Sequence, residues 1–195
     1  MVKRVSHYYF RCEEDPKNPT RSLAVLENMC KKLLIGQAII FAASDNDAEM
    51  IIRRLTETRI SCFRFPSKEY QQTRDEVVKK FKRGEIKSLV VTDSIAREMK
   101  LRRAFLVVNW HVPRFWSQQD GKWGGGDPTV YYRREETIMP FRWTGLCLTF
   151  VRSDDDERCL IEIADQLGIE LHVLKESEIA NLSQVVKRRD EGVSK

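Results

Sequence analysis

The chain has 195 residues, of which 42% are hydrophobic and 32% are charged, and this length and balance are typical of one α/β domain with a packed core. No apolar run approaches the roughly 20 residues that span a bilayer, and residues 1–10 lack the apolar stretch and cleavage site of a secretory signal. We therefore expect a cytoplasmic or nuclear protein that is neither secreted nor bound to a membrane. The formal net charge of +5 fits binding to phosphate backbones, or simply a solvated basic surface.

The cysteines and histidines argue against two further classes of protein. The five cysteines lie far apart without any C-x-x-C pair, and the three histidines have no metal-site spacing. This pattern disfavours a disulfide framework and a zinc site, and it indicates a reducing compartment. We therefore expect no metal.

Apolar patterning predicts strands that alternate with helices along most of the chain. Strands are expected at residues 5–13, 37–44, 60–65, 88–92, 104–110, 145–151 and 169–174. Helices are expected at 21–34, 45–58, 67–84, 129–138 and 154–168, with a short helix or turn at 94–99. Asp45 or Asn46 is expected to cap the second helix, and Gly84 and Gly168 to end the third and the last.

This alternation implies βαβ units, and therefore a mainly parallel sheet flanked by helices on both faces. Ligands of such sheets bind beyond the carboxyl ends of the strands. Ser44 follows one predicted strand and could hold a phosphate on the next helix or merely cap that helix. Gln71 and Arg74 share a helix face, where a fork-shaped donor could hold a phosphate or a partner carboxylate. Thr92 ends another predicted buried strand, and Arg97 follows five residues later, near the same edge of the predicted sheet.

Residues 114–128 break the alternation, because they are polar and rich in glycine. We expect a flexible surface loop here, and not a phosphate loop, since "WGGGDP" lacks the required lysine and does not follow a buried strand. Phe115, Trp116 and Trp123 lie in this segment and are candidates for binding a partner. Three alternatives stay open for them: anchoring a protein partner, stacking on bases, or local packing.

The order of these motifs resembles the second RecA-like domain of DEAD-box RNA helicases, over roughly residues 5–175. The matching segments are "QAIIFAAS" (motif IV), "QQTRDEVVKKFKRG" (the Q-x-x-R helix), "VTDSIAR" (motif V) and "VVNWHVP" (the strand before motif VI). Finer similarities point to the mRNA-export branch of the family, or to the Tudor-and-helicase proteins of germline small-RNA pathways. The resemblance implies a RecA-like domain over residues 1–175, and the charged composition of the last residues predicts a partly disordered tail over 176–195.

The resemblance also implies roles for particular residues. It places five residues at RNA-facing or coupling positions: Ser44, Gln71, Arg74, Thr92 and Arg97. Asp45 stands where motif IV usually has arginine. In motif V, Glu98 replaces a glycine that lets the backbone approach RNA, and Lys100 replaces an acid that contacts the nucleotide ribose.

Motif VI departs further from the family pattern. Arg134 keeps its first arginine, but Thr137 and Pro140 occupy the positions of the two arginines that meet the ATP γ-phosphate. Loss of such arginines lowers phosphoryl-transfer rates by about 10³–10⁵. A local gap in the alignment would instead bring Arg142 near the cleft.

We therefore expect a catalytically inactive helicase-like domain that serves RNA metabolism as a scaffold, through a protein partner, self-association or RNA binding. The alternative is the C-terminal half of an ATP-dependent DEAD-box helicase, acting in RNA unwinding or mRNP remodelling such as mRNA export. The chain contains neither a phosphate-binding P-loop nor a D-E-A-D sequence. We therefore expect the isolated domain to bind no cofactor. It should use ATP only if an N-terminal RecA-like domain completes the ATP site.

Overall fold

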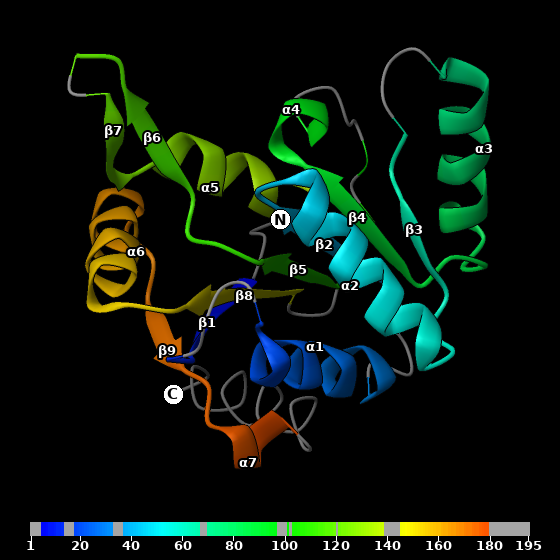
Figure 1. Cartoon of the computed structure of the whole chain (residues 1–195), viewed down its shortest axis with the longest axis horizontal. Coiled ribbons are helices and arrows are strands. Elements are labelled where there is room, and N and C mark those ends of the chain that lie inside the picture. Colours follow the sequence, from blue (N-terminus) through cyan, green and yellow to red (C-terminus); the bar gives the residue numbers. More distant parts are fainter. Residues whose placement is uncertain are drawn as a thin grey trace, which may run out of the picture.

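A parallel sheet of seven strands, in the order β3-β4-β2-β5-β8-β1-β9, forms the centre of the molecule (Figure 1). This computed structural model describes residues 5–13, 18–32, 37–66, 70–96, 101, 103–119, 121–138 and 145–179. The strands of the sheet are β1 (Val5–Arg11), β2 (Ala38–Ala42), β3 (Cys62–Arg64), β4 (Ser88–Thr92), β5 (Leu106–Asn109), β8 (Gly145–Val151) and β9 (Leu171–Val173). Every pairing among them is parallel, as the alternation of strands and helices predicts.

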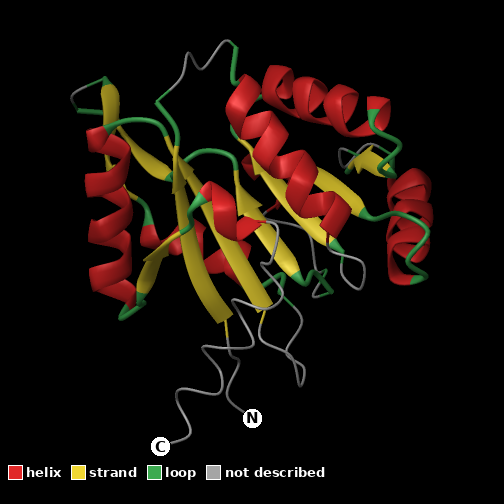
Figure 2. Cartoon of the chain, turned by 90° about the horizontal axis from the view of Figure 1, so that it is seen from below, coloured by secondary structure: helices red, strands yellow, loops and turns green. Residues whose placement is uncertain are grey.

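Helices cover both faces of the sheet, as Figures 1 and 2 show. One face is covered by α1 (Thr20–Lys32), α2 (Asp45–Glu57) and α7 (Glu176–Ile179). The opposite face is covered by α3 (Gln71–Lys82), α5 (Pro128–Glu135) and α6 (Asp154–Leu167). The short α4 (Asp93–Ala96) follows β4 directly. The predicted α/β class, with a mainly parallel sheet between two helix layers, is confirmed.

The central strands are apolar on both faces because helices cover both. Alternate residues of β2 divide between the two sides: Ile40 packs in the core with α1 and α2, whereas Ile39 and Phe41 pack in the core with α3, α5 and α6. All three side chains are buried. This two-sided burial explains why these strands appear in the sequence as continuous apolar runs.

Side chains and glycines end the helices in ways the sequence partly predicts. Ser44, not Asp45 or Asn46, caps α2, and its hydroxyl accepts a hydrogen bond from the Asp47 amide. The prediction of Asp45 or Asn46 was one or two positions late, because serine and aspartate serve equally well there, whereas the alternative that Ser44 caps this helix is confirmed. Gly168 ends α6 with φ of 63°, and Gly84 follows α3 with φ of 77°, as predicted from the tolerance of glycine for left-handed backbone.

The glycine-rich segment is an ordered hairpin, so the prediction of a flexible loop was wrong. Strands β6 (Arg114–Ser117) and β7 (Lys122–Gly126) pair antiparallel, with Trp116 opposite Trp123. Figure 1 shows the hairpin projecting beyond the sheet, next to α6.

The three glycines of β7 let this hairpin approach its neighbours closely. A Cβ on Gly124 would lie 2.2 Å from the Phe115 ring, and one on Gly126 would lie 2.3 Å from the carbonyl oxygen of Cys159 in α6. The glycine run therefore serves close packing, a role that composition alone does not distinguish from flexibility.

The structure also continues into the segment expected to be a charged tail. Helix α7 occupies residues 176–179, and Ile179 is buried in the core beside α1. Arg21 of α1 pairs with Glu176 at 3.0 Å. The predicted tail beyond 179 lies outside the described residues.

Replacing Gly126 with alanine should destabilise the fold by about 1–3 kcal/mol, because the new Cβ would collide with backbone of α6 that cannot move aside cheaply. Urea unfolding of the Gly126→Ala variant measures this. Gly125→Ala is the matched control, since its Cβ would meet the flexible end of Glu162 at 2.8 Å. Equal stability of the two variants would contradict the close packing of the hairpin on α6.

Candidate functional site

Polar side chains gather where β2, β4 and β5 end, at the carboxyl edge of the sheet. Ala42 of β2 pairs with Thr92 of β4, and Phe41 of β2 pairs with Asn109 of β5. Ser44 follows β2 at the start of α2. The parallel register thus brings the ends of three strands to the edge where α/β proteins bind ligands.

Arg134 is the centre of this region and is almost wholly buried, with a relative exposure of 4%. Its Nε and Nη2 donate to the two carboxylate oxygens of Asp93, at 2.9 and 2.6 Å. Its Nη1 donates to the side-chain oxygen of Asn109 at 3.0 Å and to the carbonyl of His111 at 3.3 Å. The guanidinium carbon also lies 5.3 Å from the centre of the Phe41 ring. Arg134 therefore joins α5 to the ends of β4 and β5.

Asn109 carries this network further into the sheet. Its Nδ2 donates to the Thr149 hydroxyl of β8 at 3.1 Å. Both residues are fully buried, and buried amides and hydroxyls need such partners. The Asp93–Arg134–Asn109–Thr149 chain consequently links two helices, α4 and α5, to two strands, β5 and β8.

Thr137, at a predicted γ-phosphate position, lies just past the end of α5 with an exposure of 6%. Its hydroxyl donates to the carbonyl of Arg134 at 2.7 Å. Its own carbonyl accepts from the Ala104 amide at 3.1 Å. Thr137 therefore closes the helix end and contributes no cation to the surface.

Two further carboxylates at the same edge have basic side chains as partners. Asp45, predicted to stand where motif IV usually has arginine, pairs with Arg64 of β3, so a cation of the sheet lies beside this carboxylate. Asp47 accepts a hydrogen bond from Ser44 at 2.8 Å and pairs with His111 at 3.3 Å. Burial opposes ionisation of Asp47, but the bonds to His111 and Ser44 outweigh it and lower the pKa of this carboxyl.

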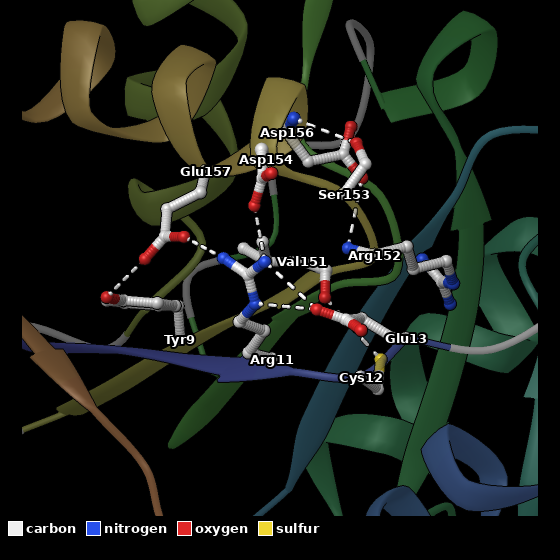
Figure 3. A network of polar contacts seen from close by, with 10 residues as sticks. All are labelled: Tyr9, Arg11, Cys12, Glu13, Val151, Arg152, Ser153, Asp154, Asp156 and Glu157. Carbon is white, nitrogen blue, oxygen red and sulfur yellow. Dashed lines mark hydrogen bonds and ion pairs between the residues drawn. The ribbon is translucent and has the colours of Figure 1, made fainter.

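A second polar network lies at the start of α6 (Figure 3). Arg11 of β1 reaches Asp154 and Glu157 in the first turn of this helix, and Tyr9 donates to Glu157 at 2.8 Å. Ser153 caps the helix by accepting from the Asp156 amide at 3.1 Å. These contacts hold α6 against the end of β1 and fix the helix on which the hairpin lies.

The predicted RNA-facing residues differ in their accessibility. Gln71 is exposed at the start of α3 and donates to Asp75 at 3.0 Å. Arg74 is buried, with its guanidinium 5.2 Å from the centre of the Phe65 ring. Thr92 is also buried, and Ser44 is occupied as a helix cap. Arg97, Lys100 and Pro140 lie outside the described residues, so their roles stay predictions.

Sequence reasoning missed the residues that hold this edge together. Asp93, Asn109, Arg64 and His111 were not singled out as partners of the motif residues. A signal for Asn109 was present, because an amide at the end of a fully apolar strand requires a buried partner. The identity of that partner depended on the packing of α5.

The described part of the chain contains no group of three or more histidines, cysteines or acids placed to hold a metal ion. Within that same part, none of the helices has the length and apolar character needed to cross a bilayer.

The fold and this strand edge agree with a known class of domain. The family of helicase conserved C-terminal domains matches residues 21–135, more than half of the chain, and the chain belongs to this family. The structure of the C-terminal domain of the DEAD-box protein Dbp5 superposes with a TM-score of 0.79 at 23% identity, covering 96% of this chain and 99% of that one. The predicted resemblance to the C-terminal RecA-like domain of DEAD-box helicases is confirmed.

Two curated relatives illustrate the similarity in sequence. The ATP-dependent RNA helicase DHH1 of Meyerozyma guilliermondii is 29% identical over 87% of this chain and 28% of its own length. The ATP-dependent RNA helicase ddx19 of Dictyostelium discoideum is 27% identical over 95% of this chain and 38% of its own length, which agrees with the predicted likeness to the mRNA-export branch. The chain thus spans about a third of these relatives. The likeness to Tudor-and-helicase proteins stays a prediction.

Replacing Arg134 with alanine should lower the free energy of unfolding by about 3 kcal/mol, because Asn109 and the His111 carbonyl would lose their buried donor. Denaturant unfolding of Arg134→Ala measures the loss. The neighbouring Arg133→Ala is the control and should change stability by about 0.5 kcal/mol or less. Similar losses in both variants would contradict a central role for Arg134.

Replacing Asp47 with asparagine should make stability depend less on pH. Since the pKa of Asp47 is depressed in the fold, its ionised form stabilises the protein above about pH 5, and this contribution disappears as the pH falls through the depressed value. Asp47→Asn should therefore be about 1 kcal/mol less stable at pH 7, with the difference in stability disappearing once the pH lies below the depressed pKa of Asp47. Thermal unfolding across this range checks it, with Asp75→Asn as control, and a gap that widens on acidification would contradict it.

Proposed function

We propose that this chain is a binding module of the DEAD-box C-terminal type that does not complete an ATP-hydrolysing site. The observation that carries the proposal is how Arg134 of α5 and Thr137 just after this helix, both in the motif VI segment, are bonded within the domain. Arg134 is held by Asp93 and Asn109, and Thr137 is turned into the end of its own helix.

The charge at these positions supports the proposal. ATP hydrolysis in this class needs cations that face the developing charge on the γ-phosphate. The guanidinium of Arg134 has its donors directed at groups of the same domain, and a threonine hydroxyl carries no charge. A proline side chain such as that of Pro140 carries no charge either. A first RecA-like domain placed beside this surface would therefore lack the stabilising cations at the two expected positions.

The binding part of the proposal rests on similar folds. Dbp5 of S. cerevisiae has been solved bound to RNA and ADP BeF3, and the C-terminal domain of its L327V variant has been solved bound to Gle1 H337R and IP6. The DEAD-box protein SrmB of E. coli has been solved bound to the regulator of ribonuclease activity RraA, with a TM-score of 0.70 to this chain. Domains of this shape thus serve as docking surfaces, and we extend that role to RNA and protein partners of this chain.

A second candidate function is the C-terminal half of an active ATP-dependent RNA helicase. Its support is the sequence similarity to proteins of that activity, DHH1 and ddx19, over most of this chain. In that case Arg142, close to the altered motif, would supply the missing cation.

A fusion of the first RecA-like domain of DHH1 to this chain separates the two functions. RNA-stimulated ATP hydrolysis by the fusion should be at least about 10³-fold slower than that of the two DHH1 domains together, because both γ-phosphate cations are replaced. The fusion should still bind single-stranded RNA without ATP, with an affinity that falls as salt rises.

The matched control is the DHH1 domain pair with its own two γ-phosphate arginines changed to threonine and proline, which should be as slow as the fusion. Hydrolysis within about tenfold of the unaltered DHH1 pair, abolished by Arg142→Ala in the fusion, would establish the active-helicase alternative. Loss of RNA binding at low salt would remove the RNA part of the proposal.

A further inference from the structure

The β6–β7 hairpin presents three large aromatic side chains to solvent. Phe115, Trp116 and Trp123 are 48%, 52% and 60% exposed. The two tryptophan rings lie edge to face, with centres 5.2 Å apart. Phe115 packs over Gly124, so local contacts account for part of its burial. The outer surfaces of the tryptophans remain uncovered, and aromatic side chains grouped in this way are typical of interaction sites.

The hairpin is fixed rigidly to α6. Arg114 pairs with Asp155 at 2.5 Å and donates to the carbonyl of Gly124 at 2.9 Å. The Gly126 amide donates to Glu162 at 3.4 Å. A rigid support lowers the ordering cost of binding, because the aromatic side chains do not have to be immobilised from a free loop.

The charge beside the hairpin is negative, although the whole chain carries +5. Helix α6 contains six carboxylates: Asp154, Asp155, Asp156, Glu157, Glu162 and Asp165. Among the described residues, three guanidinium groups pair with them, those of Arg11, Arg114 and Arg158. The hydrogen bonds from Arg158 and Arg114 hold the pKa of Asp155 below its usual range, so this carboxylate stays ionised near neutral pH. The excess of negative charge repels phosphate groups and attracts cations.

We propose that the hairpin and the adjacent face of α6 bind a segment of a protein partner that presents lysine or arginine side chains next to apolar ones. A cation would lie over the face of Trp116 or Trp123 and near the carboxylates of α6, while the apolar side chains would pack beside the rings. Single-stranded RNA could stack on the same rings, but its phosphates would meet the negative helix. This inference rests on the protein-binding part of the proposed function and is independent of ATP hydrolysis.

Selection of random displayed peptides on the whole chain tests the proposal. Peptides that bind the wild type but not the Trp116→Ala/Trp123→Ala double variant should be enriched in lysine and arginine beside apolar residues. Synthetic copies should bind the double variant at least about tenfold more weakly, as expected for aromatic hot spots. Glu162→Gln keeps the acceptor for the Gly126 amide and removes one charge, so it should weaken binding about two- to fivefold at low salt.

Phe63→Ala is the matched control, because Phe63 is 46% exposed on β3 at the other edge of the sheet and should leave peptide affinity unchanged. Far-ultraviolet circular dichroism and thermal unfolding show that each variant is folded. The proposal is overturned if no tryptophan-dependent peptides emerge, or if those that emerge are neutral or acidic. It is also overturned if a single-stranded oligouridylate RNA binds through the two tryptophans more tightly than the selected peptides. The ATP hydrolysis assay of the fusion is independent of these results. A failure of the hairpin proposal can therefore be told apart from a failure of the proposed function.

Discussion

The buried guanidinium of Arg134 is the interaction on which the site depends. It joins the motif VI helix to the ends of β4 and β5 through Asp93 and Asn109, and Asn109 extends the link to β8. A buried charge is tolerated only when its donors are satisfied, so the positions of α5 and these strand ends depend on one another. The helix that would face a nucleotide is thereby held firmly, while its arginine is directed inward.

Other charged side chains along this edge are also paired within the domain. Asp45 and Asp47, which bring negative charge to a surface expected to meet phosphates, pair with Arg64 and His111. Further along the sheet, Arg11 and Arg114 pair with the acidic first turn of α6. Among the described residues, Arg64, Arg11 and Arg114 are thus paired with carboxylates of the same domain, as the proposed binding role expects.

The hairpin illustrates why composition misleads at particular residues. A run of glycines with polar neighbours is typical of a flexible loop, yet Gly126 lies against the backbone of Cys159 and Gly124 lies under the Phe115 ring. Glycine permits both flexibility and close approach. Only the position of α6, a helix that follows later in the chain, distinguishes the two. Arg74 is buried against Phe65, nine residues earlier in the chain, so its guanidinium is not the exposed donor that was predicted.

The sequence by itself determined the class of fold, because continuous apolar runs such as β4 and β8 are typical of strands covered on both faces, and the alternation of strands and helices over most of the chain predicts a parallel sheet. It also determined that Thr137 and Pro140 carry no positive charge, since charge is a property of the residue type; that they stand at the γ-phosphate positions is a prediction from the resemblance. The tertiary structure alone decided which partners satisfy Arg134, and that two tryptophans stand exposed on a hairpin that packs against an acidic helix. These features depend on contacts between segments far apart in the chain, and local sequence patterns do not predict the geometry of such contacts.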